Sequence, residues 1–332
     1  MNIIVTGDSG FIGSYLTKLL LNGGHSVSGI DLDHRKKYAV QYPFVTGDIL
    51  DRSSLDALPA NADCIIHLAA AHKDFGITKE GYYSVNVDGM RSLVNFATER
   101  GIKKFIFYSS VAVYGNNQPS TEESSPAPVN HYGGSKLEAE IVLQQWCKED
   151  PTREAVIIRP AVVFGPLNVA NIFKLIKQVC DGKFIWVGDG KVIKSIAYVE
   201  NLVQATMFLL DGLSAGCNIY NYSDEPQLET RELVDVISRI SGSKVSSFRV
   251  PLSFALFAAK VFDVLGAMTG YDFPITSARI KKFNTSTEHR SGKIRSLGFR
   301  PGYTIEEGLR RNIDWYLENR KHVAMTVESG GE

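Results

Sequence analysis

The sequence predicts an α/β fold in which a doubly wound parallel sheet is covered by helices on both faces. Short, almost wholly apolar segments alternate along the first half of the chain with segments whose apolar residues recur at helical spacing. The 332 residues are 44% hydrophobic and carry no formal net charge. This balance is typical of a globular protein with a large core, and it argues against a nucleic-acid partner.

The elements follow one another in a regular order. Residues 2–6 are β-branched and apolar and predict the first strand, and residues 11–21 predict a helix from apolar spacing. The second strand covers residues 25–31, and a weaker third covers 44–45. The apolar runs CIIHLAA at 64–70 and FIFYSS at 105–110 predict the fourth and fifth strands, with a helix at 85–100 between them. A long helix at 132–148 and a sixth strand at 155–159 complete the series.

Several features limit where the protein works. The apolar window at 251–270 is interrupted by Lys260 and Asp263, so a packed helix is expected there and no membrane span. Strand-like sequence begins at residue 2 and leaves no room for a signal peptide, which predicts a cytoplasmic protein. The cysteines lack paired or metal-ligand spacing, so we expect free thiols and no metal site.

The segment VTGDSGFIG at residues 5–13 follows the first strand and begins the first helix. Gly7 permits a tight turn, Gly10 lets a pyrophosphate approach the backbone, and Gly13 lets the helix pack close to the sheet. The helix N-terminus, with Phe11 and Ile12, offers N–H groups and a positive dipole end to phosphates. This pattern predicts a dinucleotide site.

The choice of dinucleotide depends on the end of the second strand. Asp31 can bind both ribose hydroxyls and repel a 2′-phosphate, which favours NAD over NADP. A basic run follows closely and could accept that phosphate instead, which keeps NADP as the alternative. The run consists of His34, Arg35, Lys36 and Lys37.

Ser110, Tyr132 and Lys136 form the predicted catalytic set. Tyr132 and Lys136 are four residues apart in one helix, so the phenol and the ammonium lie on the same face. A nearby ammonium favours the phenolate and lowers a tyrosine pKa that is ordinarily about 10, which makes Tyr132 a candidate base. Ser110 is expected to end the fifth strand, at the carboxyl edge where open α/β sheets bind ligands.

These motifs resemble those of the extended short-chain dehydrogenase/reductases, in the NAD-dependent epimerase/dehydratase family that modifies nucleotide sugars. The resemblance runs from residue 1 to about 319. It is carried by TGDSGFIG, GDILD, HLAA, NVDG, SSVAVYG, YGGSK, RPAVVFGP and GFRPGYTIEEGLRRNIDWY. It implies a Rossmann-type NAD-binding domain at 1–165 with part of 190–225, and a smaller C-terminal α/β substrate-binding lobe at 166–189 and about 226–320. A flexible tail is expected at 321–332, and a homodimer is expected through the helices at 85–100 and 132–148.

The same resemblance implies roles for further residues at the cofactor. Asp48 and Ile49 would flank the adenine, although Asp48 could simply cap a turn, and His72 could contact a cofactor phosphate. Asn86 would support the site from the next helix. The residues expected to line the cofactor elsewhere are Leu68, Ala69, Ala70, Pro160 and Val163.

Four residues are implied at the substrate, each with a simpler alternative. Asn171 and Lys194 occupy places where relatives bind a diphosphate, although Asn171 could instead cap a helix and Lys194 lacks the bidentate geometry of arginine. Arg279 is a second diphosphate candidate or a solvated helix residue. Trp186 could stack on a nucleotide base or pack in the core.

The reaction is predicted to be epimerisation of a nucleotide sugar, most simply of a UDP-sugar at C4. Many dehydratases of this family carry an Asp-Glu pair after the catalytic serine or threonine, whereas Val111 and Ala112 stand here and cannot move protons. Val162 replaces an asparagine found in many sugar-modifying relatives. That change keeps a 4-ketoreductase or a hydroxysteroid-type dehydrogenase as an alternative. A non-catalytic NAD sensor is the other alternative, since a fold does not by itself specify a function.

Overall fold

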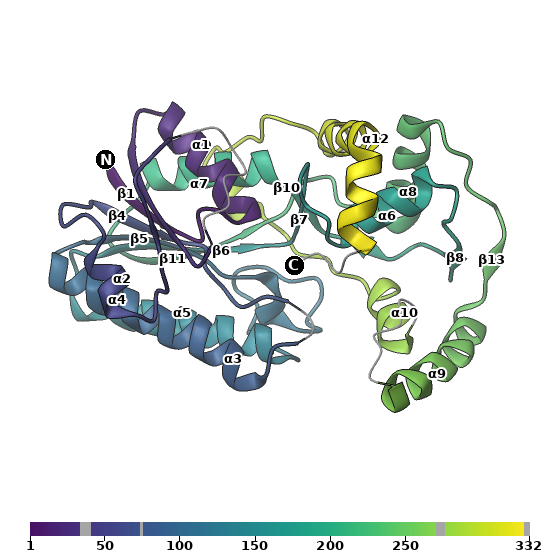
Figure 1. The fold of residues 1–332 in the computed structure, drawn as a ribbon, viewed down its shortest axis with the longest axis horizontal. Coiled ribbons are helices and arrows are strands. Elements are labelled where there is room, and N and C mark those ends of the chain that lie inside the picture. The colour runs from purple at the N-terminus through teal and green to yellow at the C-terminus, as the bar shows by residue number, and fades with distance from the viewer. Residues whose placement is uncertain (34–40, 74–75, 270–275, 329–332) are drawn as a thin grey trace. The chain divides into compact units, whose positions relative to one another are not determined.

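The structure is a computed structural model that describes residues 1–33, 41–73, 76–269 and 276–328 (Figure 1). The chain divides into two compact units. The first contains residues 1–163, 197–223 and 289–303, and the second contains residues 164–196, 224–288 and 304–332. The segment 289–303 therefore joins the first unit, although the sequence placed it in the substrate lobe.

A seven-stranded parallel sheet forms the centre of the first unit, in the order β11-β6-β5-β4-β1-β2-β3. The predicted doubly wound parallel sheet is thus confirmed. Its strands are β1 (Asn2–Thr6), β2 (Ser26–Asp31), β3 (Phe44–Thr46), β4 (Cys64–His67), β5 (Lys104–Tyr108), β6 (Glu154–Pro160) and β11 (Gly216–Tyr222).

Helices cover both faces of this sheet, as Figure 1 shows. Successive side chains of a strand point to opposite faces, so β1 contributes Ile3 and Val5 to one core and Ile4 to the other. The first core is shared with α1 and α7, and the second with α4 and α5. The helices of this unit are α1 (Phe11–Asn22), α2 (Arg52–Asp56), α3 (Lys79–Tyr83), α4 (Gly89–Arg100), α5 (His131–Glu149), α7 (Val199–Asp211) and α11 (Gly292–Ser296).

Three predicted boundaries differ from the structure. β4 ends at His67, so Leu68 to Ala70 form a loop. The helix expected from residue 85 begins earlier as α3 and passes through a π-helical turn (Ser84–Asp88) into α4. β5 ends at Tyr108, and Ser110 lies two residues beyond it as the N-cap of a 3₁₀ turn (Val111–Tyr114).

The second unit is mainly helical. Its helices are α6 (Asn171–Cys180), α8 (Thr230–Ser241), α9 (Leu252–Thr269), α10 (Ser277–Phe283) and α12 (Ile305–Glu328), and its short strands are β8 (Trp186–Val187), β9 (Ile193–Lys194), β12 (Leu228–Glu229) and β13 (Arg249–Val250). The division between the units falls within β7 (Val162–Phe164) and β10 (Ile196–Tyr198). Helix α12 continues through residues 321–328, where the sequence predicted a flexible tail. None of the helices among the described residues is both long enough and apolar enough to cross a membrane.

Candidate active site

The glycine loop connects β1 to α1 in a conformation that the three glycines make possible. Gly7 adopts φ +70°, in the left-handed region that favours glycine, and its N–H donates to the Ile30 carbonyl at 2.8 Å. A Cβ on Gly13 would lie only 2.1 Å from the Gly7 oxygen, so α1 can approach the loop only with glycine there. No side chain caps the N-terminus of α1 at Gly10. The loop therefore presents bare backbone and a helix N-terminus, which suits a pyrophosphate.

Asp31 lies at the end of β2, beside this loop. Its carboxylate accepts a hydrogen bond from the Ser9 N–H at 3.3 Å, and the Ser9 hydroxyl donates to the Asp33 carbonyl at 2.8 Å. These bonds hold the loop and the strand end together, so a phosphate at the loop and a ribose at Asp31 can be bound at once. The basic run His34, Arg35, Lys36 and Lys37 lies outside the described residues.

The loop after β4 is tied to β1. The Leu68 N–H donates to the Thr6 carbonyl at 3.0 Å, and the Ala69 N–H donates to the Thr6 hydroxyl at 3.3 Å. The same hydroxyl contacts Nδ1 of His67 at 2.7 Å. His67 is fully buried and stacks on Phe107, and burial holds the pKa of its imidazole well below the ordinary range. His67 is thus a core histidine.

The other residues predicted to lie near the cofactor's adenine or phosphates make contacts that do not point to a ligand. The Asp48 carboxylate accepts the Leu50 N–H at 2.9 Å, which matches the simpler turn-capping alternative. The Ile49 side chain is buried in the core. His72 is exposed, and its Nδ1 lies 3.2 Å from the Ala70 carbonyl. A ligand role for these three residues remains a prediction.

Asn86 joins two parts of the site. Its side-chain amide pairs with the backbone of Ala71, accepting at 2.9 Å and donating at 3.1 Å, and it also donates to the Ser135 hydroxyl at 2.8 Å. Ser135 in turn donates to the Tyr132 carbonyl at 2.9 Å. A buried amide with all these partners is rigid, so Asn86 fixes the loop after Ala70 against the first turn of α5.

Ser110, Tyr132 and Lys136 are brought to one region by the packing of α5. A Cβ on Gly133 would lie 2.5 Å from the Ala112 carbonyl oxygen, so glycine lets the start of α5 touch the turn that Ser110 caps. The Ser110 Oγ accepts the Ala112 N–H at 3.1 Å, which leaves the hydroxyl hydrogen able to point elsewhere. Tyr132 lies in the first turn of α5, after the Asn130 cap.

Lys136 is buried in this region, with only 2% of the residue exposed. Its ammonium donates to the Tyr108 carbonyl at 2.9 Å and lies 4.8 Å from the centre of the Phe107 ring. Burial lowers the pKa of Lys136 to about 7, although Glu140 one turn away opposes the shift. The amine therefore gains and loses its proton near neutral pH.

This pKa predicts a pH-dependent stability. Between pH 7 and 10.5 the unfolded chain binds a proton at Lys136 that the folded chain does not, so stability should rise with pH in this window and fall as pH drops toward 7. The gain is at most about 1.4 kcal/mol per pH unit. In urea unfolding at pH 7 and pH 9, the wild type should gain stability relative to Lys136→Met. Lys148→Met, on an exposed position of the same helix, is the control and should keep the wild-type pH profile. Parallel profiles for wild type and Lys136→Met would contradict the assignment.

A buried ion pair beneath the site was not anticipated from the sequence. Glu140, on α5 one turn after Lys136, accepts hydrogen bonds from Arg159 on β6 at 2.9 and 2.5 Å, and also from the Ser109 hydroxyl. Arg159 also donates to the Tyr114 hydroxyl at 2.7 Å. The pair thus links α5 to Ser109 before Ser110 and to Tyr114 after it. An arginine inside the apolar strand AVIIRP was the available signal, because a buried charge needs a partner.

Two predicted residues lie near the end of β6. Pro160 is buried and faces Tyr222 of β11 in the sheet register. Val163 is half-buried and packs against the first core. The predicted contact of Pro160 and Val163 with the cofactor remains a prediction.

The four predicted substrate residues lie in the second unit. Asn171 is exposed and is the first residue of α6, and the N-cap position is held by Ala170. The alternative that Asn171 caps this helix is therefore wrong. Trp186 is buried against Phe184 and Arg249, as the core-packing alternative expects. The Lys194 ammonium donates to the Thr285 carbonyl at 2.5 Å. Arg279 lies in α10, and its side chain is outside the described part of the chain.

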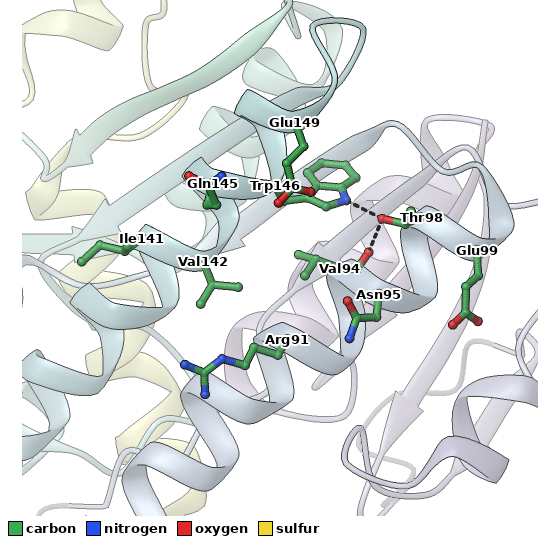
Figure 2. A pocket seen from close by; sticks show the side chains of 10 residues that line it. All are labelled: Arg91, Val94, Asn95, Thr98, Glu99, Ile141, Val142, Gln145, Trp146 and Glu149. Carbon is green, nitrogen blue, oxygen red and sulfur yellow. Dashed lines mark hydrogen bonds between the residues drawn. The ribbon is translucent and has the colours of Figure 1, made fainter.

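A groove between α4 and α5 lies away from this chemistry. Figure 2 shows its lining side chains, which come from the facing sides of the two helices and include Arg91, Thr98, Ile141 and Trp146. Trp146 donates from its indole to the Thr98 hydroxyl at 2.9 Å. None of the predicted site residues lines the groove, so we do not assign the reaction to it.

The fold and the site together define a class of protein. The first unit combines a parallel doubly wound sheet with a glycine loop that no side chain caps and an acidic residue at the end of β2. It also carries a tyrosine and a buried lysine one helical turn apart. These features are those of a dinucleotide-dependent enzyme that moves a proton and a hydride.

The comparison with known families gives the particular assignment. Residues 3–222 match the model of the NAD dependent epimerase/dehydratase family, and the chain belongs to this family. It is therefore an NAD-dependent enzyme, as the sequence predicted. The N-acetyl-alpha-D-glucosaminyl-diphospho-ditrans,octacis-undecaprenol 4-epimerase of Escherichia coli O157:H7 is 37% identical over 99% of both chains. The UDP-glucose 4-epimerase of Vibrio cholerae is 28% identical over 96% of both.

Solved structures share the fold over the whole chain. The UDP-glucose 4-epimerase of Thermotoga maritima, solved with UDP-glucose, has a TM-score of 0.77 at 22% identity, covering 97% of this chain and 100% of that one. The UDP-glucuronic acid 4-epimerase of Bacillus cereus, solved with NAD, has a TM-score of 0.76 at 23% identity with the same coverage. Taken with the family match, these relatives confirm the prediction of an NAD-dependent epimerase.

Proposed function

We propose that this enzyme inverts C4 of an N-acetylated hexose that is linked through a diphosphate to a polyprenol. The observation that carries the proposal is the relative from Escherichia coli O157:H7, which is named for that substrate and matches this chain from end to end at 37% identity. A UDP-sugar, the carrier predicted from the sequence, is the second candidate. The Vibrio cholerae relative, named UDP-glucose 4-epimerase, favours it at 28% identity. Both carriers present a sugar 1-diphosphate to the enzyme.

The residues of this chain suit NAD and the proton transfers of such a reaction. The glycine loop and Asp31 would hold NAD, which supplies hydride acceptance and return at the sugar carbon. Tyr132 as phenolate would take the proton from the C4 hydroxyl and later give it back. The Ser110 hydroxyl would donate to the same oxygen as it becomes a carbonyl. Lys136, when protonated, would favour the phenolate through its charge.

The turn after Ser110 supports epimerisation over elimination. Val111 and Ala112 form the start of the 3₁₀ turn and carry no group that could move a proton to or from the sugar. Tyr132 and Lys136 therefore have to supply the acid and base chemistry. Epimerisation needs one group that removes the hydroxyl proton and returns it, and it needs no second acid–base pair. Val162, whose apolar side chain is exposed, offers no amide contact and keeps the ketoreductase alternative under test.

The test compares two carriers and two reactions in parallel. Purified enzyme with NAD is given polyprenyl diphosphate N-acetylglucosamine or UDP-N-acetylglucosamine, and the sugars are released and separated by chromatography. We expect the C4 epimer to form from the polyprenyl substrate while the NADH absorbance band shows no net change. Turnover of the UDP-sugar alone would assign the second candidate. In a parallel reaction with added NADH and the corresponding 4-keto sugar, stoichiometric loss of NADH without epimer interconversion would overturn the epimerase in favour of a ketoreductase.

We further propose that the enzyme acts in the cytoplasm as a homodimer. The resemblance implies an interface through the helices at 85–100 and 132–148, which correspond to α4 and α5. The groove of Figure 2 lies on these helices, and the exposed apolar side chain of Ile141 at its edge supports an interface there.

A further inference from the structure

Among the described side chains of helix α9, those that are buried lie on one side of the helix. Ala255 and Ala259 on that side are buried, and the Asp263 carboxylate accepts the Ser277 N–H of α10 at 3.1 Å. Figure 1 shows α9 lying beside α10 at one end of the unit. The sequence predicted a packed helix here; the helix is confirmed, and among its described side chains the buried ones lie on this side.

The opposite side of α9 is apolar and exposed. Phe254, Phe257, Val261 and Leu265 are 63%, 72%, 59% and 40% exposed. At about 100° per residue these four side chains fall within an arc of about 80°, which we call the α9 apolar face. Such a concentration of exposed large apolar side chains is unusual on a soluble surface and marks an interaction site.

Two further exposed apolar residues lie next to the strand pair that precedes α9 in the chain. Phe248 and Ile185 are also exposed, and the pairing of Arg249 with Trp186 in β13 and β8 brings their neighbours 248 and 185 to adjacent positions. Among the described residues four phenylalanines are largely exposed, and three of them lie within the ten residues 248–257. Three of the four exposed phenylalanines therefore lie close together in the sequence.

The charged residue beside the α9 apolar face in the helix itself is positive. Lys260 is exposed and lies at the edge of the face, and the exposed Lys244 and Arg249 precede the helix. The acidic residue of α9, Asp263, points to α10 instead. Aromatic side chains on one face with lysine beside them are the pattern of a helix that lies in a membrane interface, where lysine reaches the anionic headgroups.

We propose that the α9 apolar face binds the surface of a phospholipid bilayer. This inference rests on the proposed function, because a polyprenyl diphosphate sugar resides in a membrane and its diphosphate lies at the membrane surface. An enzyme that acts on such a substrate gains from being held at that surface. The described helices cannot span a bilayer, so the contact is interfacial.

The experiment measures co-sedimentation with vesicles of phosphatidylethanolamine and phosphatidylglycerol. The full chain should bind, and the double variant Phe254→Ser/Phe257→Ser should bind at least about tenfold more weakly. Phe44→Ser, which removes an exposed phenylalanine from the edge strand β3, is the matched control and should bind like the wild type. Absence of wild-type binding, or equal binding by the double variant, would overturn the proposal.

Two further readings separate this inference from other outcomes. Light scattering without lipid measures the molecular mass of the assembly formed by each variant. A smaller mass for the double variant than for the wild type and Phe44→Ser would show that the α9 apolar face binds a second copy of the chain, and that result would overturn the membrane contact. Activity on a short, water-soluble prenyl diphosphate sugar should be equal in wild type and double variant, while activity on the full polyprenyl substrate in vesicles should fall. Vesicle binding with turnover of UDP-sugars alone would refute the proposed substrate and leave the membrane contact standing.

Discussion

Replacement of Tyr132 by phenylalanine is expected to lower turnover by a factor of about 10² to 10⁴, the range that a general base contributes. The change removes only the phenol oxygen. The fold should be retained, because the Tyr132 backbone carbonyl still accepts the hydrogen bond from the Ser135 hydroxyl in this variant. NAD binding should be retained as well, since the glycine loop and Asp31 are unaltered. Steady-state turnover of the epimerase substrate and calorimetric NAD binding check both expectations.

Tyr82 offers a matched control for this variant. Its ring lies 6.3 Å from that of Tyr132, and its hydroxyl donates to the Lys73 carbonyl at 2.5 Å. Tyr82→Phe removes a phenol oxygen from the same neighbourhood without removing the proposed base, so its turnover should stay within a few-fold of the wild type. If Tyr132→Phe retained most of its activity, or if both variants lost the same amount, Tyr132 would not be the base.

Replacement of Glu140 by leucine is expected to lower the free energy of unfolding of the first unit by about 3–5 kcal/mol. Glu140 is fully buried, and Arg159 is almost fully buried beside it. Removal of the carboxylate leaves the guanidinium without its counter-charge in a medium that solvates it poorly, and it also leaves the Ser109 hydroxyl without its acceptor. Urea unfolding at neutral pH measures the loss.

Two further variants test whether the unpaired charge is the cause. The double variant Glu140→Leu/Arg159→Met removes both charges and should recover most of the stability, because a well-packed apolar pair can replace a buried ion pair at little cost. Asp88→Ala breaks the exposed pair with Arg91 and should cost less than about 1 kcal/mol. If the double variant were no more stable than Glu140→Leu, the loss would come from packing and not from charge.

The local pattern of apolar residues was sufficient to predict most strands of the sheet. β1, β2, β5 and β6 appear close to the predicted positions because each is a short apolar run between turn residues, and burial on both faces leaves little choice of structure. β11 was not predicted. Its sequence, GCNIYNY, mixes polar and apolar residues, and it becomes a strand through parallel pairing with β6. Such pairing across long sequence separation is decided by tertiary packing.

The sequence by itself determined the glycine loop, the acidic end of β2 and the helical spacing of Tyr132 and Lys136, because each depends on residues that are close along the chain. Only the tertiary structure decided that Lys136 is buried, that Glu140 pairs with Arg159 on a different element, and that Phe254 and Phe257 on α9 face outward. Periodicity identifies which residues share a face, but what covers that face is settled by elements distant in sequence. Charge, burial and exposure at this site therefore follow from packing, while the loop and helix that carry it follow from local chemistry.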